Sequence, residues 1–154
     1  MKMLLEEKPL PRRMPPRARL ETTRLIASEI SRHREILLAL VYGGFTRHKL
    51  FRDIDIAVYT AGKISYHDEP YYIYTLSLLL SRLAGAPVDV KLLDYAPPGF
   101  RVTVLTAGWL LFSRRPGLRW SLLLRAKDEL RGLQRHAQTK PQATRTQAAH
   151  STPG

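Results

Sequence analysis

The sequence predicts an α/β (α+β) domain in which a small mixed β-sheet is packed with helices. Short apolar runs bounded by glycines or acidic residues are typical of buried strands. Between them lie segments whose apolar residues recur at helical spacing. The resulting order is helix, strand, strand, helix, strand, helix, strand, helix, and this order favours helices layered on one sheet.

Four strands are expected. The first is a continuous apolar run that ends in two glycines, as in a strand covered on both faces. The next two carry acidic residues on one face and aliphatic residues on the other. The predicted strands are residues 36–42, 53–60, 87–93 and 109–112.

Four helices are expected as well. The first is expected to be capped by Thr22 or Thr23 and to end near Arg34. A second starts at Glu69 and Pro70 and ends near Gly85. The others cover residues 97–107 and 117–136. The residues that define the apolar faces of the three long helices are Leu25, Ile26, Ile30, Ile73, Leu76, Leu80, Leu83, Leu118, Leu122, Leu130 and Leu133, with Trp120 adding apolar surface on the last.

Composition divides the chain into a domain with two flanking segments. Residues 1–19 are basic and proline-rich and are expected to be extended or disordered. Residues 20–136 form the domain, and residues 137–154, rich in Gln, Thr, Ala and Pro, are expected to be a disordered tail. No apolar run is long enough for a membrane span or a signal peptide, so a cytoplasmic protein without a membrane partner is expected. The absence of cysteine excludes disulfides and thiolate metal sites.

The formal net charge of +12 is concentrated in two regions, residues 1–19 and 114–136. Such a field attracts phosphates, whether of a nucleotide, a nucleic acid such as RNA, or an acidic protein. The alternative is that these arginines only solvate a helix face. The sequence leaves both interpretations open.

Three aspartates indicate a metal site. Asp53 and Asp55 are two residues apart in one strand and therefore share a face, and Asp89 lies in a later strand. Unpaired charges on a buried strand are costly, so a cation is expected among them. The glycine pair Gly43–Gly44 just before the second strand allows a phosphate to approach the backbone closely. Together these residues predict a site for Mg²⁺ and a nucleoside triphosphate; a solvated strand edge is the alternative for the aspartate pair alone.

These motifs resemble a known family. The glycine pair, the basic residue after it, and the two acidic strands resemble the core signature of the DNA polymerase beta-like nucleotidyltransferases, most closely the minimal nucleotidyltransferase (MNT) group. The resemblance covers about residues 37–93 and continues weakly to residue 112. The residues that carry it are Gly43-Gly44, Arg47, Asp53-Ile54-Asp55-Ile56 and Val88-Asp89-Val90.

The resemblance implies roles for these residues. Two Mg²⁺ ions would be held by Asp53, Asp55 and Asp89, and Asp89 would also help to deprotonate the acceptor. Gly43 and Gly44 would cradle the β- and γ-phosphates, and Arg47 would lie near the phosphates. Gly44 stands where the family usually has serine, so one hydroxyl contact to a phosphate is missing.

The implied function is metal-dependent transfer of a nucleoside monophosphate, AMP from ATP, onto a hydroxyl with release of pyrophosphate. Small proteins of this group are often antitoxins that attach AMP to a tyrosine of a HEPN-type toxin, so a HEPN-type protein or a second subunit is the expected partner. The alternative is a catalytically degenerate module that binds RNA or a protein through the basic C-terminal helix.

Overall fold

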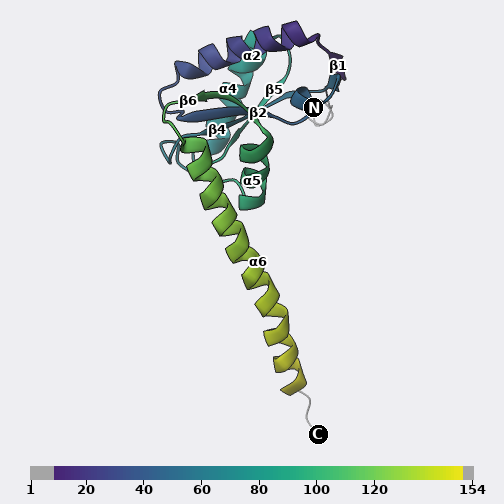
Figure 1. Ribbon diagram of the computed structural model, residues 1–154, viewed down its shortest axis with the longest axis vertical. Helices are drawn as coiled ribbons and strands as arrows, with labels where there is room; N and C mark the ends of the chain where they lie inside the picture. The colour runs from purple at the N-terminus through teal and green to yellow at the C-terminus, as the bar shows by residue number, and fades with distance from the viewer. Residues whose placement is uncertain (1–8, 151–154) are drawn as a thin grey trace.

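The structure is a computed structural model that describes the backbone of residues 9–150 and the side chains of residues 9–138. Helices and strands alternate along the chain in the predicted order, with short additional elements near the N-terminus and the glycine pair (Figure 1). They are β1 (Arg12–Arg13), α2 (Pro16–Ser31), β2 (Leu38–Tyr42), α3 (Gly44–Arg47), β3 (Leu50–Phe51), β4 (Ile54–Tyr59), α4 (Glu69–Ala84), β5 (Val88–Leu92), α5 (Pro98–Ala107), β6 (Trp109–Ser113) and α6 (Leu118–His150).

The main sheet has four strands in the order β5-β4-β2-β6. β2 pairs antiparallel with both β4 and β6, while β4 and β5 are parallel. The sheet is therefore mixed, which confirms the predicted fold class. β1 and β3 form a separate two-residue antiparallel pair.

Helices cover both faces of the sheet. Figure 1 shows α2 along one face with α4 behind it, and α5 with the start of α6 on the other. Ile54, Ile56 and Val58 of β4 pack in the core of the first face, whereas Ala57 belongs to the second. Because successive strand residues point to opposite faces, each buried strand supplies both cores.

The N-terminal segment differs from the expectation. Residues 1–8 lie outside the described residues, but β1 forms at Arg12 and α2 begins at Pro16 rather than near Thr22. Pro16 is tolerated there because the first helical N–H groups have no partner within the helix. Thr22 lies in the interior of α2, where its side chain is buried against the core, and does not cap the helix. Leu25, expected on the buried face, is 49% exposed because the longer helix directs Thr22, Ile26 and Ile30 to the core.

The predicted C-terminal boundary also differs. α6 runs to His150 and extends far from the body, whereas a disordered tail was expected from residue 137 (Figure 1). A helix that is already nucleated adds one hydrogen bond for each further residue, so a composition too weak to start a helix can still continue one. None of the described helices combines the length and apolar composition needed to cross a membrane.

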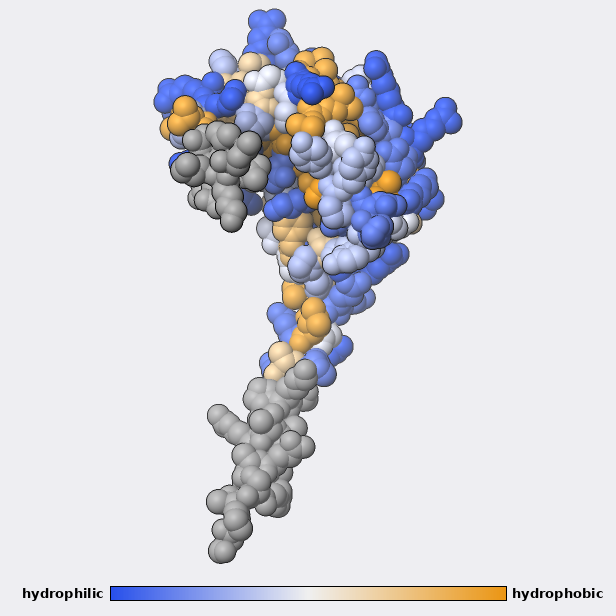
Figure 2. Space-filling view, turned by 180° about the vertical axis from the view of Figure 1, so that it is seen from behind, coloured by the Kyte–Doolittle hydropathy of each residue, from blue (hydrophilic) through white to orange (hydrophobic). Residues whose placement is uncertain are grey.

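Apolar side chains remain exposed on α6. Leu122 is buried, but Trp120 is 58% exposed and Leu124 is 64% exposed, and Leu133 is exposed as well. Figure 2 shows apolar surface along α6 where the helix leaves the body. Only the first turns of α6 reach the sheet, so the predicted apolar face is longer than the core that it covers. Leu83 at the end of α4 is likewise partly exposed.

Candidate active site

The three predicted aspartates converge at one end of the sheet. Asp55 lies in β4 directly beside Asp89 of β5 in the parallel register, and Asp53 immediately precedes β4. One carboxylate oxygen from each residue lies within 4.8 Å of the others. All three side chains are partly accessible to solvent. The expected convergence of Asp53, Asp55 and Asp89 is therefore present.

The electrostatics of this cluster favour a bound cation. Burial, followed by the charges of Asp53 and Asp89, raises the pKa of Asp55 to about 7. Burial also raises the pKa of Asp89, and Asp53 adds to this shift. The charge of Lys91 opposes both shifts. Carboxylate oxygens are the ligands that Mg²⁺ prefers, so the residues present fit a divalent metal.

Lys91 and Tyr42 complete the surroundings of the carboxylates. Lys91 lies two residues after Asp89 on the same strand face, a position that the alternation of β5 already indicated. Tyr42 pairs with Asp55 in the antiparallel register. Its hydroxyl oxygen is buried and has no hydrogen-bond partner among the described residues. Burial and the charges of the three aspartates raise the pKa of Tyr42, so its hydroxyl stays protonated and available to donate.

The glycine pair lies against these carboxylates. Gly43 has φ +79°, a left-handed conformation that favours glycine, and a Cβ at this position would collide with the Asp55 carboxylate. Gly44 has more room, since a Cβ there would meet only His48 Cδ2 at 3.7 Å. The hydroxyl of Thr46 donates to the carbonyl of Gly43 at 2.7 Å and closes the turn. The expected proximity of the turn to the aspartates is thus observed.

A cavity of about 220 Å³ opens beside the glycine turn. Gly43 and Thr46 lie on one side of it, and Phe100 of α5 lies on the other. Arg47, which the sequence placed near the phosphates, is exposed and also lines this cavity. The cavity therefore separates the glycine turn from α5, and none of the three aspartates is among its lining residues.

Arg19 holds the glycine loop in place, although the sequence assigned it to a disordered segment. Its guanidinium donates to the carbonyls of Met14, Phe45 and Lys49 at 2.9, 2.6 and 2.7 Å. It also lies 5.3 Å from the ring centroid of Phe45. No sequence pattern marks this role, because it arises only when α2 packs against the loop after β2.

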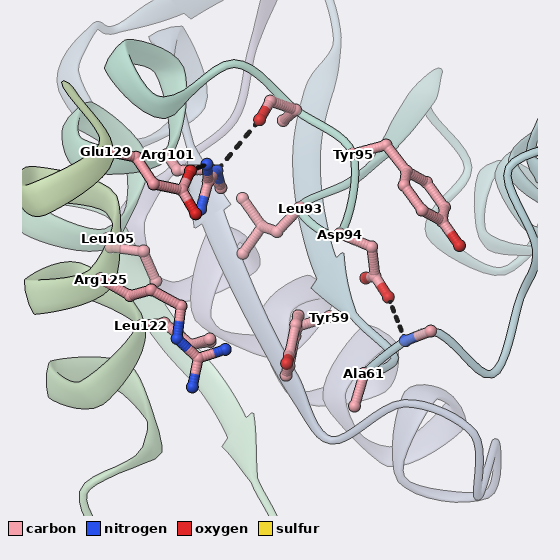
Figure 3. A pocket seen from close by; sticks show the side chains of 12 residues that line it. Tyr59, Ala61, Leu93, Asp94, Tyr95, Arg101, Leu105, Leu122, Arg125 and Glu129 are labelled. Carbon is pink, nitrogen blue, oxygen red and sulfur yellow. Dashed lines mark hydrogen bonds and ion pairs between the residues drawn. The ribbon is translucent and has the colours of Figure 1, made fainter. Parts of the chain in front are cut away.

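A different cavity, of about 390 Å³, lies at the opposite ends of β4 and β5. Figure 3 shows Arg101 facing Glu129, with which it forms an ion pair, and Asp94 bonded to the backbone after Ala61. Arg125 of α6 also extends into this space. None of the three converging aspartates lines this cavity, so the candidate active site lies elsewhere.

The sheet, the paired aspartates and the adjacent glycine turn define a nucleotidyltransferase domain. A family model described as "Polymerase beta, Nucleotidyltransferase" matches residues 25–116. The match covers more than half of the chain, and the chain belongs to this family. The activity class that the family implies is nucleotidyl transfer. A search of curated proteins found no match.

Solved structures with the same fold come from toxin–antitoxin complexes. One, a toxin–antitoxin structure with AMP-PNP, is 19% identical with a TM-score of 0.62, covering 79% of this chain and 97% of the other. A second, MntA–HepT, is 18% identical with a TM-score of 0.59 and coverages of 84% and 98%. A third describes a tri-AMPylated Shewanella oneidensis HEPN toxin with its MNT antitoxin; it is 19% identical with a TM-score of 0.58 and coverages of 79% and 98%. These likenesses confirm the polymerase beta-like fold that the sequence resembled.

Proposed function

We propose that this protein is a Mg²⁺-dependent nucleotidyltransferase that transfers AMP from ATP onto a tyrosine hydroxyl of a HEPN-type protein and thereby acts as an antitoxin. The observation that carries this proposal is the convergence of Asp53, Asp55 and Asp89 beside the Gly43–Gly44 turn. The third solved structure contains an AMPylated HEPN toxin, which supports a HEPN-type protein as the acceptor. A cytoplasmic location remains a prediction.

Different residues of the chain would bind the metal ions and the phosphates during transfer. Asp53 and Asp55 would bind two Mg²⁺ ions, with Asp89 as the third carboxylate of the site. The backbone N–H groups around Gly43 and Gly44 would hold the β- and γ-phosphates, and Arg47 would approach them from the same cavity. Bound Mg²⁺ would neutralise the phosphate charge and align the reacting groups.

The chemical step is a displacement at the α-phosphorus. The acceptor oxygen forms a bond to this phosphorus, the bond to the bridging oxygen of the β-phosphate breaks, and pyrophosphate leaves. Asp89 would accept the proton of the acceptor hydroxyl. Tyr42 would donate a hydrogen bond within the site because its hydroxyl remains protonated.

Substitution of Asp53 or Asp55 by asparagine tests the proposal. Asparagine is nearly isosteric with aspartate but lacks its charge, so Asp53→Asn and Asp55→Asn should lower AMP transfer at least about a thousandfold while the fold remains. The assay follows label from the α-phosphate of ATP into a HEPN-type protein, with and without Mg²⁺. Asp68→Asn, at an exposed acid outside the cluster, is the matched control. Wild-type transfer by the Asp55→Asn variant would contradict the metal-ligand role.

One feature favours a second function, namely binding through the C-terminal helix without catalysis. Trp120, Leu124 and Arg125 are all exposed on α6, and the helix extends beyond the body. A module of this kind would bind RNA or a protein equally well after substitution of all three aspartates. Partner binding by an Asp53→Asn/Asp55→Asn/Asp89→Asn variant, measured beside transfer, separates the two functions.

A further inference from the structure

β5 is an edge strand of the main sheet, and most of its free edge is closed by serines of α4. The N–H of Val88 donates to the hydroxyl of Ser81 at 2.8 Å, and the N–H of Val90 donates to the hydroxyl of Ser77 at 3.0 Å. Unpaired strand edges invite other chains to pair with them. These two hydroxyls therefore block the first part of the edge.

The next outward-facing N–H of this edge belongs to Leu92. Hydrogen-bonding directions alternate along a strand, and the N–H of Leu93 points inward, to Val58 of β4. Ser81 and Ser77 are four residues apart, and the same step along α4 leads to Ile73, which has no hydroxyl. The N–H of Leu92 consequently finds no such acceptor among the described residues. This N–H is therefore available to an acceptor that reaches the edge of the strand from outside.

A cavity of about 440 Å³ lies at this point of the edge. Ile73, Leu92 and Phe100 give it an apolar lining. Glu69 lies in the same lining, and its Oε2 is buried without a hydrogen-bond partner among the described residues. The cavity thus combines apolar surface with a free backbone donor and a free carboxylate acceptor.

The cavity lies beyond Asp89 along β5, on the side of β4 that is away from the glycine turn. The order of the strands places β2, with its Gly43–Gly44 turn, on one side of β4, and β5, with Asp89, on the other. In an in-line displacement the attacking oxygen lies opposite the leaving pyrophosphate. If the glycine turn holds the pyrophosphate, the acceptor enters from β5. Lys91 lies between the aspartates and the cavity. It shares a face of β5 with Asp89, and its ammonium lies 5.5 Å from the ring centroid of Phe100, which lines the cavity.

The geometry points to the end of β5 at Leu92 as the docking site for an extended polypeptide segment that carries the acceptor hydroxyl. This inference rests on the proposed transferase function. A backbone carbonyl of the segment accepts a hydrogen bond from the N–H of Leu92, as when a strand adds to the edge of a sheet. A donor on the segment binds Glu69, and an apolar side chain enters the cavity. Nucleic acid fits less well, because nucleic-acid interfaces are strongly cationic and Lys91 is the one cation in this lining.

Substitution of Ile73 by serine provides a direct test. Ile73→Ser adds a third hydroxyl in the series of Ser81 and Ser77, where it can accept the N–H of Leu92 and close the edge. Ile73→Ala loses similar packing without adding a hydroxyl and is the matched control. The probe is a blocked pentapeptide with tyrosine at its centre, valine on both sides and lysine at both ends.

Two readouts are measured for each variant. Without ATP, the probe should shift the amide NMR signal of Leu92 in the wild type and in Ile73→Ala but not in Ile73→Ser. With Mg-ATP, Ile73→Ser should raise the KM for the probe at least about tenfold relative to Ile73→Ala and leave the affinity for Mg-ATP unchanged.

The outcomes are distinct. Equal behaviour of the serine and alanine variants would overturn the docking site, and so would a shift of the Leu92 amide by Mg-ATP alone, which would place the nucleobase in the cavity. If no variant transfers AMP but the probe still shifts Leu92 in the wild type and not in Ile73→Ser, the docking site stands and the proposed transferase function fails.

Discussion

The carboxylate of Asp55 occupies the space into which a side chain at position 43 would project. Gly43 adopts φ +79° directly after β2, and its neighbour Tyr42 pairs with Asp55 across the sheet. The turn and the carboxylate can therefore lie in contact only while residue 43 is glycine. This close approach sets the distance between the glycine turn, proposed to bind phosphates, and the carboxylates, proposed to bind metal.

Gly43→Ala should damage both stability and the site. An alanine Cβ would collide with the Asp55 carboxylate, and the left-handed backbone adds strain, together about 2 kcal/mol or more. We expect a lower midpoint of thermal unfolding and at least about tenfold weaker binding of Mg-ATP. Calorimetric unfolding and an isothermal titration measure the two effects. An alanine variant with unchanged stability would show that the carboxylate can move away from the turn.

Gly44→Ser should have the opposite effect. A Cβ at this position has space, and serine is the residue that the family usually carries there. A hydroxyl that bonds a phosphate contributes about 0.5–1.5 kcal/mol, which predicts about two- to tenfold tighter triphosphate binding. Titration of wild type and variant with Mg-ATP tests this. Weaker binding by the serine variant would mean that the phosphates do not pass over residue 44.

Asp55→Asn should stabilise the metal-free protein at neutral and higher pH. The pKa of Asp55 is about 7 in the folded state, against 3.8 as its ordinary value. Between these values the folded state binds more protons than the unfolded state, so the stability contributed by Asp55 is lost as the pH rises through 7. Solvent screening at this partly exposed site reduces the effect to about 1–2 kcal/mol.

Thermal unfolding across pH in the presence of a chelator measures this difference. The variant should gain on the wild type between about pH 4 and pH 7, and the difference should stay constant above that range. Added Mg²⁺ should then raise the unfolding temperature of the wild type more than that of the variant. A difference between the two proteins that stays constant with pH would show that Asp55 keeps its ordinary pKa.

The strands and the cluster of carboxylates were predictable from the sequence because local patterns determine them. Alternation placed Asp53 and Asp55 on one face, the cost of unpaired charge brought Asp89 to them, and the glycine pair marked the end of β2. Contacts between distant segments leave no such pattern. The three carbonyls bound by Arg19 come from residues on both sides of a loop, and the serine caps on β5 depend on how α4 packs. The sequence also shows how much apolar surface α6 carries but not where the helix leaves the body.

Arg19→Met should loosen the glycine loop. Methionine keeps an apolar stem of similar length but cannot donate to the carbonyls of Met14, Phe45 and Lys49, so about 2 kcal/mol of stability should be lost. Binding of Mg-ATP should weaken, since the turn at Gly43 is no longer held by α2. Arg17→Met is the control, because its ion pair with Glu21 is highly exposed. If the two variants behave alike, the bonds of Arg19 do not contribute to the site.

The exposed part of α6 should bind a partner through charge and apolar contact together. Arg125 has no ion-pair partner among the described residues, and Leu124 beside it is exposed. We expect Arg125→Glu to weaken binding of a HEPN-type protein about tenfold at low salt and much less at high salt, because salt screens exposed charges. Leu124→Asp should weaken binding at both ionic strengths, since burial of apolar surface is not screened.

Arg24→Glu, a reversal at an exposed position of α2, is the control for net charge. Affinity measured by surface plasmon resonance at the two salt concentrations checks these effects, and equal losses for Arg24→Glu and Arg125→Glu would assign them to net charge rather than to α6.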